Sequence, residues 1–214
     1  MMTSPRWYSW HNDYDDLETV ATRRLQVVQE TLTQALDMAP PGALRAISMC
    51  AGQARDLLPI LINHPRGQDI SAMFVERDEL NAAFLLGAIG STGLVDIDVV
   101  QADAGNTDTY LSSGPADLVL LGGVFANIDL IDARSTVDSL TALCRPGAVV
   151  VWSCYGPRLT EAAEIPVLFE AADFQRITAR HDAEDGFTVA AHRYRGQSTE
   201  LRPGRQFFRF TDVA

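Results

Sequence analysis

The chain has 214 residues, of which 47% are hydrophobic, and its formal net charge at pH 7 is -11. The length and the apolar content suffice for one globular domain with its own core. The negative charge disfavours a nucleic acid as partner, because nucleic-acid-binding proteins need a basic field to displace counterions. The 17 basic residues are all arginines. The lack of lysine excludes Schiff-base enzymes and phosphate-loop nucleotide hydrolases.

No apolar stretch approaches the roughly 18–20 residues that span a bilayer, and the N-terminal stretch lacks the pattern of a signal peptide. We therefore expect a cytoplasmic protein without a membrane partner. The three cysteines and four histidines stand at spacings that predict neither a disulfide framework nor a metal site. Five arginines near the C-terminus are interpreted as a solvated face, with a basic patch as the alternative: Arg193, Arg195, Arg202, Arg205 and Arg209.

The first predicted element is an amphipathic helix over residues 17–36, whose apolar residues recur at steps of three and four. Asp15 or Asp16 is its expected N-cap, and the sequence APPG that begins at Ala39 is expected to end it. An aromatic stretch precedes the helix and contains Trp7, Trp10, His11 and Tyr14.

Short apolar runs then alternate with helical stretches, which predicts βαβ units on a parallel sheet. The predicted strands are 43–49, 70–76, 95–101, 117–122 and 147–153, and the predicted helices are 54–63, 78–90, 105–112, 130–143 and 160–172. The runs 174–181 and 187–195 flank Asp185 and Gly186, a hairpin signal, so the sheet is expected to end in an antiparallel pair. Residues 206–210 are a candidate for a last strand.

The turn after the first predicted strand reads CAGQARD, from Cys50 to Asp56. Ligands of open parallel sheets bind beyond the carboxyl ends of the strands, and Gly52 lets the backbone approach a ligand closely. Glu76 ends the second strand, where an acid can accept two hydrogen bonds from a ribose diol. The pattern therefore indicates a nucleoside-containing cofactor. The dinucleotide fingerprint G-x-G-x-x-G fails at Ala54 and Leu57, which disfavours a nicotinamide reductase.

The turn resembles motif I of the class I S-adenosylmethionine-dependent methyltransferases, with Ala54 where a second glycine is usual. Four further segments resemble motifs of that family in the same order: FVERD, VVQADAGNTDTY, ADLVLLGGVFANI and CRPGAVVVWSCYG. The resemblance covers residues 43–195. It implies an α/β, three-layer Rossmann-like fold with a mostly parallel seven-stranded sheet that ends in an antiparallel hairpin. It also implies S-adenosyl-L-methionine as cofactor and S-adenosyl-L-homocysteine as product.

The resemblance further implies that Glu76 binds the ribose hydroxyls and Asp103 the adenine amine. Each residue has another interpretation: Gly52 as a turn glycine, Glu76 as a solvated acid, Asp103 as a helix N-cap. Ala54 is strained if its φ is positive, and its methyl group then crowds the cofactor; as a first helical residue it is harmless. The expected cofactor-binding residues are Cys50, Ala51, Gly52, Asp56, Glu76, Arg77, Asp103, Ala104 and Gly123.

Methyl transfer from a sulfonium requires alignment, exclusion of water and, in some cases, removal of a proton. The catalytic candidates are His11, Tyr14, Asn127 and Tyr155. His11 is the best general base available, and a docking role for it stays equally open.

We expect one domain, made of an N-terminal helical lid (residues 1–42), a cofactor-binding core (43–195) and a C-terminal extension (196–214). Its expected activity is methyl transfer to a small apolar or aromatic metabolite. The alternative is a catalytically silent cofactor-binding or scaffold protein with the same fold. The oligomeric state stays open, a homodimer included.

Overall fold

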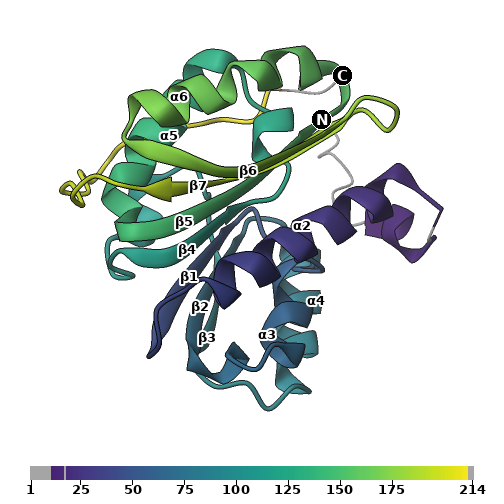
Figure 1. The fold of residues 1–214 in the computed structure, drawn as a ribbon. Coiled ribbons are helices and arrows are strands. Elements are labelled where there is room, and N and C mark those ends of the chain that lie inside the picture. Colours follow the sequence, from purple (N-terminus) through teal and green to yellow (C-terminus); the bar gives the residue numbers. More distant parts are fainter. Residues whose placement is uncertain (1–10, 17, 212–214) are drawn as a thin grey trace, which may run out of the picture.

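The computed structural model describes residues 11–16 and 18–211. Within them one seven-stranded sheet has the order β3-β2-β1-β4-β5-β7-β6, and helices cover both of its faces (Figure 1). The strands β1 to β5 are parallel, and β7 lies antiparallel between β5 and β6. The predicted α/β fold with a terminal antiparallel pair is thereby confirmed. The strands are β1 (Leu44–Met49), β2 (Ile70–Glu76), β3 (Ile97–Gln101), β4 (Ala116–Leu121), β5 (Cys144–Tyr155), β6 (Phe174–Asp182) and β7 (Phe187–Tyr194).

Three helices share one apolar core with a face of the sheet: α2 (Val20–Asp37), α3 (Leu57–Asn63) and α4 (Glu79–Gly90). The helices α5 (Leu130–Leu143) and α6 (Ile165–Ala171) share the other core. Short 3-10 helices complete the elements: η1 (His11–Asp15), η2 (Gly67–Asp69), η3 (Thr107–Tyr110), η4 (Val124–Ala126) and η5 (Gly156–Ala163). None of the helices in the described part of the chain is long and apolar enough to cross a membrane.

Helix α2 departs from its predicted pattern at its N-terminal end. Its N-cap is Thr19, whose side-chain oxygen accepts a hydrogen bond from the Thr22 backbone N–H, so the prediction of Asp15 or Asp16 as the cap was wrong. Val28, Leu32 and Leu36 are buried, as the apolar periodicity predicts. Val20 is 38% exposed, whereas Arg24, on the same helix, is only 5% exposed. The first turns of α2 therefore bury a cation instead of an apolar side chain.

Residues 204–211, which we call the C-terminal strap, return from β7 to the loops that follow β3 and β4. Phe207 is 1% exposed and Phe208 is 3% exposed. Consecutive buried residues do not fit the alternation of a strand, and the strap makes only an isolated bridge, between Asn106 and Gln206. The prediction of a last strand over 206–210 was therefore wrong. The predicted helix 105–112 is likewise shortened to η3, which Asn106 caps through the backbone N–H of Asp108.

A buried histidine lies in the core of the terminal strands. His192 is 0% exposed on β7, and its ring stacks on that of Phe169, with 4.5 Å between the centroids. Its Nδ1 accepts a hydrogen bond of 3.2 Å from Nε1 of Trp152. Its Nε2 has no hydrogen-bond partner among the described residues. Burial lowers the pKa of His192 to about 4, and the charge of Arg176 adds to this effect.

The lowered pKa predicts a loss of stability in acid. The unfolded chain binds a proton at His192 near pH 6.5, and the folded chain only near pH 4. The stability contributed by the neutral ring is complete above pH 6.5 and is lost as the pH falls toward 4, by about 3 kcal/mol. We expect chemical denaturation of the His192→Phe variant, compared with the parent at each pH, to show this difference. A difference in unfolding free energy that stays constant from pH 7.5 to 4 would contradict the assignment.

Candidate functional site

The turn between β1 and α3 has a left-handed backbone at alternate residues. The φ angles are 53° at Cys50, 56° at Gly52 and 51° at Ala54. Only glycine adopts such angles without strain, so Ala54 costs about 1–2 kcal/mol relative to a right-handed conformation. Ala54 is 0% exposed and packs in the core that α3 shares with the sheet. Its methyl group therefore strains the turn but does not project into the space at the strand tips.

The carboxylate of Glu76, at the tip of β2, is bonded to that turn. Its Oε2 accepts a hydrogen bond of 2.6 Å from the backbone N–H of Gly52, and its Oε1 accepts one of 2.7 Å from Asp78. Glu76 is 7% exposed, so its interpretation as a solvated acid was wrong. Burial raises its pKa, and hydrogen bonds from backbone N–H groups oppose that rise. Each oxygen keeps a further lone pair that can accept a hydrogen bond from a ligand.

Asp103 lies beyond the end of β3, and both of its carboxylate oxygens have partners. Oδ1 accepts a hydrogen bond of 2.9 Å from the backbone N–H of Gly105, and Oδ2 accepts one of 3.2 Å from Nε2 of Gln206 in the C-terminal strap. Because Asn106 caps η3, Asp103 is not that helix's N-cap. Ala104 is 3% exposed, and its carbonyl accepts a hydrogen bond from the Tyr110 hydroxyl. Its methyl group lies in the core.

Cys50 lies close to both acids. Burial raises the pKa of the Cys50 thiol, and the negative charges of Glu76 and Asp103 raise it further. The thiol therefore stays protonated and is a poor nucleophile. Ala51 is 7% exposed, and its backbone N–H bonds to the carbonyl of Val75. Arg77, the residue after Glu76, is exposed.

The tips of β4 and β5 meet at Gly123. This residue has a φ of 75°, and its N–H donates a hydrogen bond of 3.0 Å to Oγ of Ser153. A Cβ at this position would lie 3.0 Å from Cε1 of Tyr155, the last residue of β5, so a side chain here would displace the ring. Nδ2 of Asn127 donates a hydrogen bond of 2.9 Å to the Gly123 carbonyl. Burial raises the pKa of Tyr155, and a hydrogen bond with the Asn127 side chain opposes part of that rise.

Arg24 of α2 joins this group through Tyr155, which packs against the same core as α2. Its Cζ lies 3.7 Å from the centroid of the Tyr155 ring, a cation–π arrangement. Its Nη2 donates a hydrogen bond of 2.8 Å to the hydroxyl of Tyr14 in η1. Burial raises the pKa of Tyr14 to about 12 and also raises that of Tyr155. Both hydroxyls are therefore protonated at neutral pH and can act as hydrogen-bond donors but not as bases.

Asp56 places a carboxylate beside this cluster. Its Oδ1 accepts a hydrogen bond of 2.7 Å from the backbone N–H of Leu57 and so caps α3. Its Oδ2 lies 3.0 Å from the position that a Cβ of Gly122 would take, so a side chain there would have to displace this carboxylate. Burial raises the pKa of Asp56 to about 6, and the charge of Arg24 opposes that rise. The carboxylate of Asp56 and the guanidinium of Arg24, which have opposite charges, thus lie close together at the strand tips.

Of the four catalytic candidates, Tyr14 and Tyr155 contact Arg24, and Asn127 contacts Tyr155. The side chain of the fourth, His11, lies outside the described residues, as do Trp7 and Trp10. Arg24 itself was missed by the sequence analysis. A signal was present, because Arg24 precedes the buried Val27 and Val28 by three and four residues and so shares their helix face.

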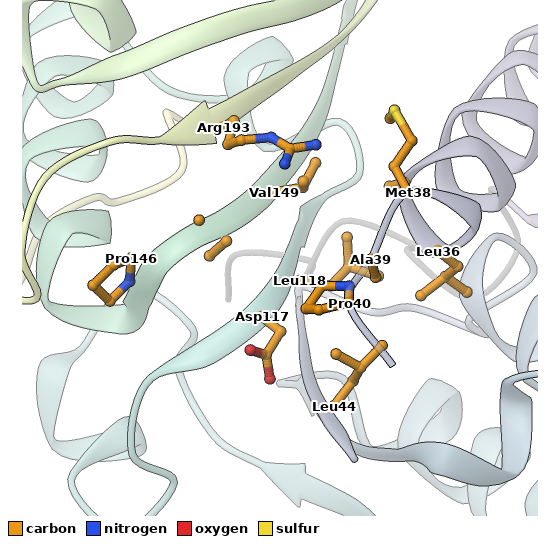
Figure 2. A pocket seen from close by; sticks show the side chains of 13 residues that line it. Leu36, Met38, Ala39, Pro40, Leu44, Asp117, Leu118, Pro146, Val149 and Arg193 are labelled. Atoms are coloured by element: carbon orange, nitrogen blue, oxygen red, sulfur yellow. The ribbon is translucent and has the colours of Figure 1, made fainter. Parts of the chain in front are cut away.

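A separate cavity of about 370 Å³ lies at the other end of the central strands, where β1 and β4 begin (Figure 2). It is bounded by the start of β1 at Leu44, the start of β4 at Asp117 and the side chain of Arg193. The end of α2 and the first half of β5 complete its walls. It contains none of the predicted site residues, so it is distinct from the strand-tip site.

No model of a known protein family matches the sequence, and neither does any curated protein. Solved structures do match the fold. The magnesium protoporphyrin IX methyltransferase of Synechocystis PCC 6803, solved with bound SAM, has a TM-score of 0.69 at 14% identity, over 89% of this chain and 92% of that one. A SAM-dependent methyltransferase of Aquifex aeolicus has a TM-score of 0.63 at 12% identity, over 87% and 97%.

The carbon methyltransferase CurJ matches with a TM-score of 0.64 at 12% identity. The match covers 80% of this chain but 54% of CurJ, so the chain spans about half the length of that protein. The chain therefore has the fold of the class I S-adenosylmethionine-dependent methyltransferases.

Proposed function

We propose that the protein binds S-adenosylmethionine along the strand tips and transfers its methyl group to a small molecule. The observation that carries the proposal is the distribution of charge along this edge. Two acids, Glu76 and Asp103, lie at the β2 and β3 end, and Arg24 lies with Asp56 at the β1 and β4 end. An adenosine offers hydrogen-bond donors, and an amino-acid group carries both charges, so the two halves of the edge fit the two halves of this cofactor.

At the adenosine half, Glu76 is the residue proposed to hold the ribose diol. Its oxygens are fixed by the backbone N–H groups of Gly52 and Asp78, which leaves their outer lone pairs for two hydroxyl donors. Asp103 is proposed to accept from the adenine amine, since its carboxylate lies beyond the neighbouring strand β3. Arg77, exposed beside Glu76, is proposed to border the same ligand.

At the methionine half, Arg24 is proposed to bind the carboxylate and Asp56 the ammonium group. A guanidinium that is already oriented by Tyr14 and Tyr155 loses little entropy when it forms such a bond. Asp56 is held by Leu57, and a bound cation would lower its pKa toward that of an ordinary carboxylate. Gly52, whose N–H bonds to Glu76, is proposed to leave room for a ligand close to the backbone.

When bound, the cofactor supplies a methyl group activated by a sulfonium. The chain itself aligns the acceptor and excludes water. Tyr155 and Asn127 are proposed to orient the acceptor by hydrogen bonds, and the start of α2 with η1 to close the site as a lid. The rest of α2 packs on the sheet, so the lid is proposed for residues 11–24 alone. The net charge of -11 supports a small molecule over a nucleic acid as acceptor.

The proposed activity is tested by transfer of label. Protein incubated with S-adenosylmethionine labelled in its methyl group is mixed either with a small-molecule extract or with tRNA and duplex DNA. We expect S-adenosylhomocysteine to accumulate with the extract only, and mass spectrometry of the labelled product then identifies the acceptor. Labelled nucleic acid would overturn the acceptor class. Cofactor binding without turnover in any fraction would favour the silent protein.

Glu76→Gln is expected to weaken the binding of S-adenosylhomocysteine by about 2–3 kcal/mol, because charge-assisted hydrogen bonds to the ribose are lost. The stability of the fold should fall by about 1 kcal/mol, because the amide nitrogen cannot accept from the second of the backbone donors, Gly52 and Asp78. Titration calorimetry and chemical denaturation measure the two effects separately. Glu79→Gln, three residues later on the exposed start of α4, is the matched control and should leave both values unchanged.

A further inference from the structure

The C-terminal strap ties together the loops at the tips of β3 and β4. The N–H of Phe207 donates a hydrogen bond of 2.8 Å to the carbonyl of Gly105, in the loop after β3. The N–H of Thr211 donates one of 2.9 Å to the carbonyl of Asn127, in the loop after β4. Both loops border the candidate site. The strap, which follows the last strand of the sheet, therefore reaches this site.

Gln206 is the strap residue that contacts Asp103, a residue predicted to bind the cofactor. Its Nε2 donates hydrogen bonds to Oδ2 of Asp103 at 3.2 Å and to the carbonyl of Phe208 at 2.7 Å. The other oxygen of Asp103 is held by Gly105 at 2.9 Å. The carboxylate is therefore held from both sides, once by its own loop and once by a residue from the end of the chain.

The position of this amide is set by its neighbours and not by its own burial. Phe207 and Phe208 are buried next to it, and a bridge pairs Gln206 with Asn106. Gly105 allows the close approach, because a Cβ there would overlap the Phe208 carbonyl and lie 2.7 Å from Nε2 of Gln206. Gln206 itself is exposed, so a substitution that keeps its length should leave the strap in place.

We propose that Gln206 is a positioning residue that orients the carboxylate of Asp103 toward the exocyclic amine of the adenine. This inference rests on the proposed function. A carboxylate that is fixed before the ligand arrives loses less conformational freedom on binding than one that rotates freely. Gln206 thus acts on the recognition of the base through Asp103, and without its amide the carboxylate of Asp103 keeps only the hydrogen bond from Gly105 among those of the described residues.

The test compares two ligands that differ at the amine. S-adenosylhomocysteine carries the exocyclic amine, and S-inosylhomocysteine carries a carbonyl oxygen in its place, which a carboxylate repels. We expect the parent protein to prefer the first by about tenfold or more in titration calorimetry. In Gln206→Met, which keeps the length but removes the donor, the affinity for S-adenosylhomocysteine should fall about fivefold and that for S-inosylhomocysteine should stay unchanged.

The control is Gln197→Ala, a glutamine of the same extension whose backbone carbonyl accepts a hydrogen bond from Tyr194, so the substitution keeps that bond. It should retain the preference of the parent. An equal loss of affinity for both ligands in Gln206→Met would mean that the strap only shapes the site, and unchanged affinities for both ligands would mean that Asp103 needs no positioning. Either result overturns the inference. A parent that binds neither ligand overturns the proposed function as well, which separates the two failures.

Discussion

Replacement of Arg24 by alanine is expected to weaken the binding of S-adenosylhomocysteine by about 3–4 kcal/mol, a loss of a few hundredfold. Arg24 is 5% exposed and held by two tyrosines. Water therefore screens little of the attraction between this guanidinium and a carboxylate bound to it. Such a partly buried pair is worth more than a surface ion pair. Titration calorimetry measures the affinity, and chemical denaturation shows whether the fold is retained.

Two variants on the same helix separate charge from geometry. Arg24→Lys keeps the charge but lacks the planar group that stacks on Tyr155. Its affinity for S-adenosylhomocysteine should therefore lie between those of the parent and of Arg24→Ala. Arg23→Ala is the matched control, because Arg23 bonds instead to Asp185 in the β6–β7 hairpin, with 2.6 Å between Nη2 and Oδ1. It should bind as the parent does. Equal affinity in Arg24→Ala and the parent would remove Arg24 from the site.

Gly105→Ala is expected to detach the C-terminal strap and to lower the free energy of unfolding by about 3–4 kcal/mol. The added Cβ would overlap the carbonyl oxygen of Phe208, a backbone atom that cannot move without the strap. Loss of the contacts of Phe207 and Phe208, which are 1% and 3% exposed, removes two buried aromatic side chains from the core. Chemical denaturation measures the loss, and limited proteolysis should then cut within residues 204–211.

Gly87→Ala is the control for this substitution. Gly87 lies within α4, and a Cβ there meets nothing within 4 Å. Alanine at this position should stabilise the protein by up to about 1 kcal/mol, because glycine is a poor helix former. A Gly105→Ala variant as stable and as resistant to protease as the parent would show that the strap is not fixed at this point.

The central strands were predictable because they are buried on both faces. Such strands appear in a sequence as continuous apolar runs, and the runs at 43–49 and 70–76 correspond closely to β1 and β2. The helices over 78–90 and 130–143 were equally clear, because Asp78 and Asp129 cap them locally. The position of Glu76 at a strand tip followed from this register.

The features that the sequence analysis did not predict depend on contacts between distant parts of the chain. Two adjacent phenylalanines in the C-terminal strap have the composition of a strand, and only the loop at Gly105 and the nearby Tyr110 explain why both are buried. Arg24 has the polarity of a helix surface residue, and its burial depends on Tyr14 and Tyr155. The burial of both phenylalanines has no local pattern that could reveal it, whereas the spacing of Arg24 from Val27 and Val28 was a signal that the sequence analysis did not use.

Ala54 illustrates a question that the sequence could pose but not answer. The family pattern has glycine at this position, and the φ of 51° gives the physical reason. The sequence did not indicate the direction of the methyl group, which decides whether the cofactor is crowded. Because Ala54 is 0% exposed, the departure from the pattern affects the strain of the turn and leaves the strand tips open.

Titration calorimetry of the unmodified protein with S-adenosylhomocysteine, beside a titration with NADPH, tests the central claim most directly. The arrangement of Glu76, Asp103, Arg24 and Asp56 predicts one binding event per chain with S-adenosylhomocysteine and no heat of binding with NADPH. A well-folded protein that gives no binding with S-adenosylhomocysteine at millimolar concentration, or that binds NADPH in its place, would contradict the assignment of the strand-tip site.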